Sequence, residues 1–195
     1  MTEITLLDGG MGQELVARSG GTDPGPLWAT RVMIDHPGMV GAIHDDYFAA
    51  GASVATTNTY AILHDRLVRD GMDAYYHALH LRALAEAHEA RARAGRGIIA
   101  GSMGPLGDSY RPDLTPGIDV SAPLYAEKAA LMAPHVDVIL IETMSSLDLV
   151  RGALKGAQAA GKPVWLSVSV HDRDGTRLRS AEPLAHLRGV RDAAP

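Results

Sequence analysis

The stretch DVILIETM, residues 137–144, has the pattern of a strand buried on both faces. Its central residues, 138–141, are all apolar, with no alternation of apolar and polar positions. That pattern is typical of parallel strands covered by helices on both sides. The run then ends in Glu142 and Thr143, at the carboxyl end, where parallel sheets gather their ligand groups. The stretch therefore predicts a parallel sheet with its chemistry at the strand ends.

Four other stretches show the same pattern, and helical patterns separate them. The strand-like runs are residues 4–10, 53–60, 97–105 and 163–170. The helical patterns are residues 37–52, 72–94, 121–135 and 146–160. Ser121, and Ser145 or Ser146, are suited to begin the last two helices. Strands alternating with helices predict βα units and the α/β class.

The strand ends decide between an open sheet and a barrel. Five runs carry polar residues at or near their ends: Asp8; Thr57, Asn58 and Thr59; Ser102; Glu142 and Thr143; Ser167 and Ser169. An open sheet gathers ligand groups at one switch point, whereas a barrel gathers them from many strands. No Gly-x-Gly-x-x-Gly follows the first run. We therefore expect a (β/α)8 TIM-type barrel.

The barrel is expected to be incomplete, because about five strands are present where the closed fold needs eight. We read residues 1–195 as a single domain, the N-terminal part of such a barrel. The edge of the fifth strand would expose unpaired backbone. That edge favours a homo-oligomer or a partner chain.

Composition excludes several function classes. The net charge is -5 and no run of Lys or Arg occurs, which argues against nucleic acid or an anionic membrane as partner. The N-terminus lacks a basic region and a long apolar run, and no window suits a membrane span, so we expect a cytoplasmic protein. The cysteine count is zero, which excludes disulfides, a Cys nucleophile and Cys zinc ligands within the chain.

Asp8 and Glu142 are the two carboxylates that end strands. In a barrel both would point to the same mouth, where they suit an ammonium group, a divalent metal or acid–base work. A helix N-cap or a loop contact is the structural alternative. Gly9, Gly10 and Gly12 follow, either to bring backbone N–H groups close to an anion or to form a tight turn.

The stretch TTNTY, residues 56–60, is unusually polar for a strand end. Thr57, Asn58 and Thr59 would be costly if buried without partners, so they are satisfied within the barrel mouth or contact a ligand. Tyr60 and Trp28 suit an aromatic wall for a cationic methyl donor. Core packing is the alternative for both rings.

The nine histidines offer no strong metal site. His77 and His80 lie three apart on a helical pattern that also contains His88, which favours a solvated helix face. We expect His44 to be structural. His171, just after the fifth run, lies at the end of the sheet where ligands bind.

Six stretches together resemble the homocysteine S-methyltransferase family, in matching order and spacing along essentially the whole chain. They are LLDGGMGQEL (6–15), LWAT (27–30), HPGMVGAIHDDYFAAGASVATTNTY (36–60), IAGSMGPLGD (99–108), VILIETM (138–144) and RSAEPL (179–184). The resemblance implies a β/α barrel and an S-methyltransferase of methionine biosynthesis. It implies methyl transfer from a sulfonium, ammonium or folate donor to the zinc-bound thiolate of homocysteine. S-methylmethionine, S-adenosylmethionine, betaine and methylfolate all remain open as donors.

The resemblance also implies residue roles. Asp8, Gly9 and Gly10 would contact the amino acid part of homocysteine, and Glu142 would hold its amino group. The polar strand end falls on Thr57, Asn58 and Thr59. Trp28 and Tyr60 match the aromatics that enclose the donor in betaine-using members. No residue of the chain is assigned to catalysis itself.

The sequence departs from the family in the residues that hold the metal. A thiol has a pKa of about 8.5, and a zinc ion favours its thiolate form. The family holds this zinc with cysteines in Gly-x-Asn-Cys and Gly-Gly-Cys-Cys stretches after strands six and eight, and this sequence contains neither. Ala181 also stands where the family usually has Gly. Two alternatives therefore stay open: an inactive partial barrel that binds an amino acid or a partner chain, and a Mg²⁺-dependent lyase or aldolase using Asp8 and Glu142.

Overall fold

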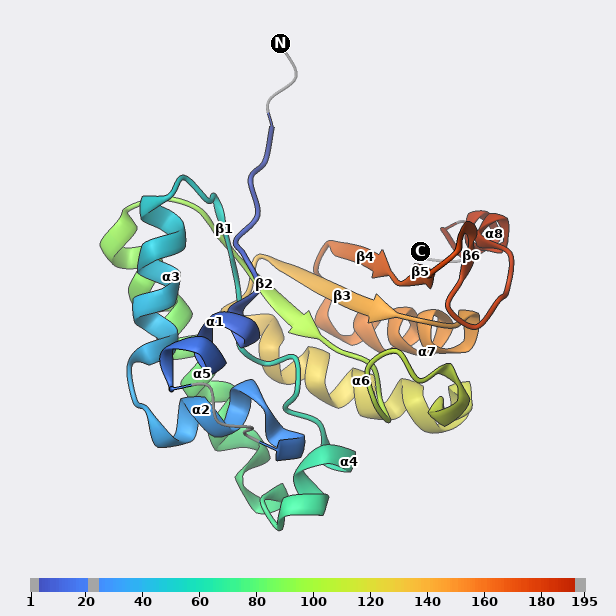
Figure 1. The fold of residues 1–195 in the computed structure, drawn as a ribbon, viewed down its shortest axis with the longest axis horizontal. Helices are drawn as coiled ribbons and strands as arrows, with labels where there is room; N and C mark the ends of the chain where they lie inside the picture. The colour runs from blue at the N-terminus through green and yellow to red at the C-terminus, as the bar shows by residue number, and fades with distance from the viewer. Residues whose placement is uncertain (1–3, 21–24, 192–195) are drawn as a thin grey trace. The chain divides into compact units, whose positions relative to one another are not determined.

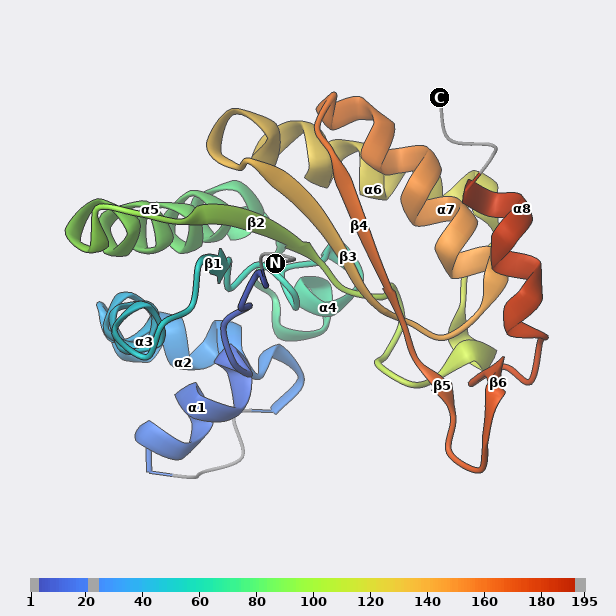
Figure 2. The same cartoon turned by 90° about the horizontal axis from the view of Figure 1, so that it is seen from above.

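The computed structural model describes residues 4–20 and 25–191. The chain divides into two compact units, Met1–Ser102 with His135–Val138, and Met103–Pro134 with Ile139–Pro195. Each unit is described by itself. Helices and strands alternate along the chain, as Figures 1 and 2 show.

The strands are parallel, as the sequence predicts. In the first unit β1 (Val54–Thr56) pairs with β2 (Ile98–Met103) in parallel. In the second unit β3 (Val138–Met144) pairs with β4 (Val164–Val168), also in parallel. The strand order is β1-β2-β3-β4. The predicted α/β class with a parallel sheet is confirmed, and these βα units are those of part of a β/α barrel.

The first unit contains α1 (Met11–Arg18), η1 (Gly25–Leu27), α2 (Ala29–Asp35), α3 (Met39–Ala49), α4 (His64–Leu67), η2 (Val68–Asp70), η3 (Asp73–Tyr75) and α5 (Tyr76–Ala94). Helices α3 and α5 pack against each other, and Phe48, Ala55 and Ala90 form a buried apolar cluster. Helix α3 follows Gly38, and Gly95 follows the last residue of α5. Both glycines have positive φ, a conformation that other residues adopt only at a cost.

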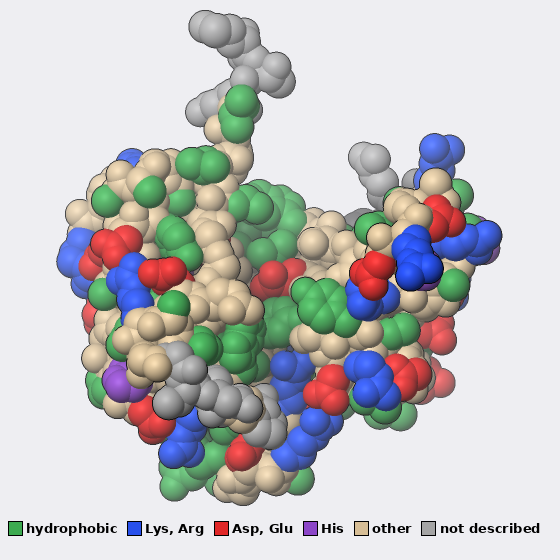
Figure 3. Space-filling model, viewed as in Figure 1, with side chains coloured by type: hydrophobic (Ala, Val, Ile, Leu, Met, Phe, Trp, Pro, Cys, Tyr) green, Lys and Arg blue, Asp and Glu red, His purple; other side chains and the backbone are tan. Residues whose placement is uncertain are grey.

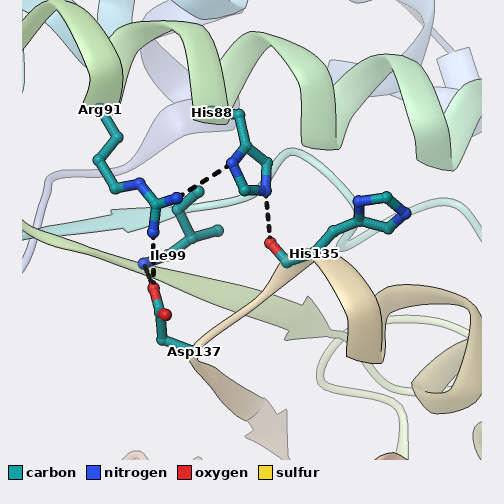
Figure 4. A network of polar contacts seen from close by, with 5 residues as sticks. All are labelled: His88, Arg91, Ile99, His135 and Asp137. Atoms are coloured by element: carbon teal, nitrogen blue, oxygen red, sulfur yellow. Dashed lines mark hydrogen bonds and ion pairs between the residues drawn. The ribbon is translucent and has the colours of Figure 1, made fainter.

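A polar network joins α5 to β2 and to the segment before β3 (Figure 4). Asp137 Oδ2 accepts the backbone N–H of Ile99 at 2.7 Å and Arg91 Nη1 at 3.0 Å. His88 Nε2 lies 2.7 Å from the carbonyl oxygen of His135, and His88 Nδ1 lies 3.2 Å from Arg91 Nη2. Since Arg91 can only donate, His88 Nδ1 is the acceptor and Nε2 carries the proton.

The second unit contains η4 (Pro112–Leu114), α6 (Ile118–Met132), η5 (Ala133–His135, shared with the first unit), α7 (Leu147–Ala157), η6 (Gln158–Ala160), η7 (Leu184–Leu187), α8 (Arg188–Arg191) and the antiparallel pair β5 (Val170–His171) and β6 (Asp174–Leu178). Helices α6 and α7 lie side by side (Figures 1 and 2). A Cβ at Gly156 would come within 2.4 Å of the Tyr125 Cβ. Only glycine permits this close helix contact.

The first predicted strand, residues 4–10, is wrong as a strand. The segment lies beside β1 through the Leu6 carbonyl, which accepts the Ser53 N–H at 2.9 Å, but it forms no ladder. Ile4, Leu6 and Leu7 are exposed, so this run gains little from burial. The other four predicted strands form, although β1 is shorter than expected.

Of the two predicted helix N-caps, one forms and one does not. Ser146 caps α7, because its side chain accepts the N–H of Leu149. Ser121 does not cap α6, which begins three residues earlier at Ile118. The Ser121 side chain is buried and donates to the Ile118 carbonyl instead. The β5–β6 hairpin was not predicted.

On the face drawn in Figure 3, acidic and basic side chains are interspersed and do not form separate patches. Within residues 4–20 and 25–191, no helix is long and apolar enough to cross a membrane.

Candidate functional site

Asp8 is held against β1 by Thr56. Its Oδ2 accepts the Thr56 N–H and its Oδ1 accepts the Thr56 hydroxyl, both at 2.6 Å. Burial raises the pKa of the Asp8 carboxyl, and the two Thr56 hydrogen bonds oppose that rise. The loop contact considered from sequence is therefore present. Each oxygen of a carboxylate has a second lone pair, so a carboxylate fixed in this way can still accept from a ligand.

The glycines after Asp8 accommodate aromatic rings. A Cβ at Gly9 would lie 2.8 Å from the Tyr47 ring, and one at Gly12 would lie 2.3 Å from the Trp28 ring. Gly10 is exposed and precedes α1 directly, with no close neighbour. Tyr47 was missed from sequence. Burial raises the pKa of its hydroxyl, and the charges of Glu14 and Asp8 raise it further.

The polar end of β1 is bonded within the protein. Thr57 Oγ1 accepts the Ser102 N–H at 3.1 Å and lies 2.7 Å from Thr59 Oγ1. Thr59 Oγ1 also donates to the Ser102 carbonyl at 2.8 Å, and Asn58 Nδ2 donates to the Ala29 carbonyl at 3.2 Å. All three side chains are buried. These contacts match the alternative in which the strand end is satisfied internally, while direct substrate contact stays a prediction.

Trp28 and Tyr60 do lie together, as predicted for an aromatic wall. Their ring centres are 6.3 Å apart and their planes meet at 74°. Both residues are half-buried. The Arg66 guanidinium lies over Tyr60, 5.6 Å from the ring centre. Sequence reasoning missed Arg66, because nothing in the spacing of α4 marks it.

Glu142 lies in a β-bulge near the end of β3. From Ile141 to Met144 the chain advances three residues, while β4 advances two, from Leu166 to Val168. Thr143 has φ 64°. Positive φ is a true outlier for a β-branched residue, and such strain clusters at functional sites. Bulges re-aim side chains and are frequent beside active sites, so this geometry singles out Glu142.

The turn after Glu142 is held by the segment 179–182, which follows β6. The Glu182 carboxylate accepts the Leu147 N–H at 2.9 Å and the Ser180 hydroxyl at 2.6 Å. The Ser180 N–H donates to the Ser145 carbonyl at 3.0 Å. Asp8 belongs to the first unit and Glu142 to the second. Their convergence on one site stays a prediction.

Comparison with known proteins decides the family. The sequence profile described as homocysteine S-methyltransferase matches residues 5–195.

The chain belongs to the homocysteine S-methyltransferase family.

Two curated relatives and one solved structure show the extent of the likeness. The chain is 29% identical over 202 residues to homocysteine S-methyltransferase of Escherichia coli (strain K12), covering 93% of this chain and 65% of that protein. It is 26% identical over 201 residues to homocysteine S-methyltransferase YbgG of Bacillus subtilis (strain 168), covering 93% and 63%. The crystal structure of the homocysteine methyltransferase MmuM from Escherichia coli, in its metallated form, matches with a TM-score of 0.86 and 26% identity, covering 100% of this chain and 72% of that one. The chain thus spans less than two thirds of the two curated relatives.

At position 181 the RSAEPL stretch departs from the glycine that the family resemblance implies, and nothing in the structure explains the alanine. Ala181 adopts φ 71°, in the left-handed region where glycine is preferred. The family's usual glycine fits this backbone without strain, whereas Ala181 adopts it at a cost.

The residues of this chain do not fit the family's zinc. The sequence has no cysteine, and within the described residues no three His, Asp or Glu side chains group as metal ligands. His77 is exposed as expected, but His80 is buried and its Nδ1 lies 2.9 Å from the Tyr76 carbonyl, so the predicted solvated face is wrong there. His171 Nδ1 accepts the Arg173 N–H at 3.3 Å.

Proposed function

We propose that this chain binds homocysteine for transfer of a methyl group to its sulfur, which yields methionine. The observation that carries the proposal is the bulge at Glu142 with strained Thr143 beside it. Family membership supports the substrate. The strain is a cost that the sheet would avoid if Glu142 only ended a strand.

The amino acid part of homocysteine carries an ammonium and a carboxylate. In this proposal Glu142 accepts from the ammonium, and Asp8, oriented by Thr56, contacts the amino acid part of the substrate. The backbone N–H groups at Gly9 and Gly10 donate to the substrate carboxylate. Thr57, Asn58 and Thr59 brace the end of β1 through their bonds to Ser102 and Ala29.

The methyl group would come from a sulfonium, ammonium or folate donor next to Trp28 and Tyr60. In the reaction the homocysteine thiol loses its proton to water, its sulfur forms a bond to the methyl carbon, and the bond from that carbon to the donor breaks with its electron pair, which stays on the donor. The residues described here supply binding and orientation. None of the contacts among them activates a thiol, and the zinc ligands of the family are absent from this chain.

A second candidate function is an inactive chain that binds homocysteine or another amino acid without methylating it. This candidate needs only the binding residues, and residues 1–195 contain no cysteine to hold zinc. It shares the Glu142 binding role, so it differs from the first only in turnover.

Isothermal titration of the 195-residue chain with homocysteine tests the binding role. Glu142→Gln should weaken binding by about tenfold or more, the usual cost of losing a charge-assisted contact. Glu127→Gln, an exposed control on α6, should bind as the parent does. Equal binding by Glu142→Gln and the parent would refute the assignment. Methionine formation with each donor class then separates the two candidates: turnover supports the enzyme, and binding without turnover supports the inactive chain.

A further inference from the structure

We propose that Glu182 is a positioning residue, which holds Glu142 in the orientation that binds the ammonium group of homocysteine. The inference rests on the proposed function, because Glu182 acts through Glu142. Both residues belong to the second unit. The Glu182 carboxylate accepts the N–H of Leu147 at 2.9 Å. Leu147 is the first residue of α7, so its N–H has no partner within the helix.

The segment 143–147, which joins Glu142 to α7, contains backbone strain. Thr143 has φ 64°, which is unfavourable for a β-branched side chain. Such a conformation persists only where the surrounding structure fixes it. Other parts of the second unit supply hydrogen bonds that fix this segment: from the Ser169 N–H to the Met144 carbonyl at 2.9 Å, from the Ser180 N–H to the Ser145 carbonyl at 3.0 Å, and from the Leu147 N–H to Glu182.

The Glu182 carboxylate is itself held in place. Its Oε2 also accepts the Ser180 hydroxyl at 2.6 Å. The Leu178 N–H donates to the Glu182 carbonyl at 2.8 Å, and the Ala181 N–H donates to the Leu178 carbonyl at 2.8 Å. These bonds fix both the backbone and the side chain of Glu182. The carboxylate is therefore a fixed acceptor for Leu147, and the positive end of α7 favours its charge.

The direction of Glu142 depends on the backbone at both of its sides. Pairing with β4 fixes the chain at Ile141, immediately before Glu142. The bond between Glu182 and Leu147 fixes the chain after it. Without Glu182 the later anchor is lost, and the strain at Thr143 can relax. Because Thr143 directly follows Glu142, this relaxation would turn the Glu142 carboxylate away from its bulge orientation.

Isothermal titration of the full chain with homocysteine measures the effect. Glu182→Ala should weaken binding by about tenfold, because it releases the segment that follows Glu142. Glu182→Gln keeps an acceptor for the Leu147 N–H and should weaken binding by only about threefold. Asp148→Ala is the matched control, since it removes a carboxylate from the first turn of α7. Asp148 is exposed and pairs with Arg151, so this variant should bind as the parent does.

A double-mutant cycle separates positioning from a general loss of stability. When Glu182→Ala is added to Glu142→Gln, the Kd should change by less than about twofold, because the charge that Glu182 positions is already absent. Amide hydrogen exchange gives a second measurement that needs no ligand. The Leu147 N–H should exchange faster in Glu182→Ala than in the parent, since its acceptor is lost.

Several outcomes would overturn the positioning role. They are a parent-like Kd for folded Glu182→Ala, an equal loss for Asp148→Ala, a loss of the same size in the Glu142→Gln background, and unchanged exchange at Leu147. If Glu182→Ala does not fold, Glu182→Gln decides, and parent-like binding by that variant overturns the role.

The proposed function fails separately. If the parent does not bind homocysteine, or Glu142→Gln binds it equally well, the proposed function is wrong and the positioning role falls with it. Weakened binding by Glu142→Gln together with parent-like binding by Glu182→Ala counts against Glu182 alone.

Discussion

The carboxylate of Glu86, on α5, accepts the backbone N–H of Gly41 in the first turn of α3 at 2.8 Å. The first N–H groups of a helix have no partner within it. Gly38, at the N-cap of α3, has no side chain to offer one. Glu86 thus caps α3 from a different helix, and Arg82 Nε lies 3.4 Å from its other oxygen.

Replacing Glu86 with Ala should destabilise the chain by about 2 kcal/mol, because a buried cap and its charge are lost together. Urea unfolding followed by circular dichroism measures the change. Glu89→Ala, at an exposed position on the same helix, is the matched control and should shift the free energy of unfolding by less than about 0.5 kcal/mol. Equal effects of the two variants would contradict a capping role.

Gly12→Ala should cost about 1–3 kcal/mol, the usual range for overpacking, because its Cβ would lie 2.3 Å from the Trp28 ring. The displaced indole should also change the tryptophan emission. Gly10→Ala is the control, since its nearest neighbour would be Gln13 Cβ at 3.9 Å. If both variants unfold at the parent's urea midpoint, the close approach of Trp28 to α1 is wrong.

Ala181→Gly should stabilise the chain by about 1 kcal/mol, because glycine adopts the left-handed backbone of this position without the strain that alanine carries. A thermal melt detects the gain as a higher Tm. Ala185→Gly, in η7, tests the opposite case and should lower the Tm, since glycine gains no relief there. A lower Tm for Ala181→Gly would show that position 181 is not strained.

His44 should make the chain sensitive to mild acid. It is fully buried, neither ring nitrogen has a hydrogen-bond partner within the described residues, and burial lowers its pKa from 6.5 to about 4, with the Asp45 charge opposing the shift. Between those values the unfolded chain binds the proton and the folded chain does not. Stability therefore falls as the pH drops through this window, by up to about 3 kcal/mol.

His44→Leu removes the titrating group while keeping a buried side chain. Urea unfolding at pH 7 and at pH 4.5 should show a smaller loss of stability on acidification for this variant than for the parent. His77→Leu, at an exposed position of α5, should leave the acid sensitivity unchanged. Identical losses for parent and His44→Leu would mean that another group governs the acid response.

Sequence patterns predicted the parts of the fold that depend on local signals. The continuous apolar run before Glu142 predicted β3, and Ser146 predicted the start of α7. Residues 4–10 have the same apolar pattern, yet they form no strand, because strand formation also requires a partner ladder and burial that a local pattern does not report.

The candidate site was predictable in composition and less so in geometry. Asp8 and Glu142 were recognised as carboxylates after strand-like runs, Trp28 and Tyr60 were recognised as an aromatic pair, and this pair does come together. The Thr56 bonds to Asp8 and the Glu86 cap on Gly41 join residues more than 40 positions apart. Such partners depend on the packed structure, and neither spacing nor propensity reveals them.

The bulge at Glu142 and Thr143 also determines how the end of β3 responds to the deletion of a residue. Side chains alternate between the two faces of a strand, so adding or removing one residue exchanges the faces of everything on one side of the change. At the bulge, β3 already has one residue more than β4 between Ile141 and Met144. Deleting Thr143 would remove this extra residue, so Ile141, Glu142 and Met144 would oppose residues 166–168 in regular register and Met144 would keep its face. A one-residue deletion here would therefore abolish the bulge without changing the pairing beyond it, whereas the same deletion elsewhere in β3 would exchange the faces of the residues that follow.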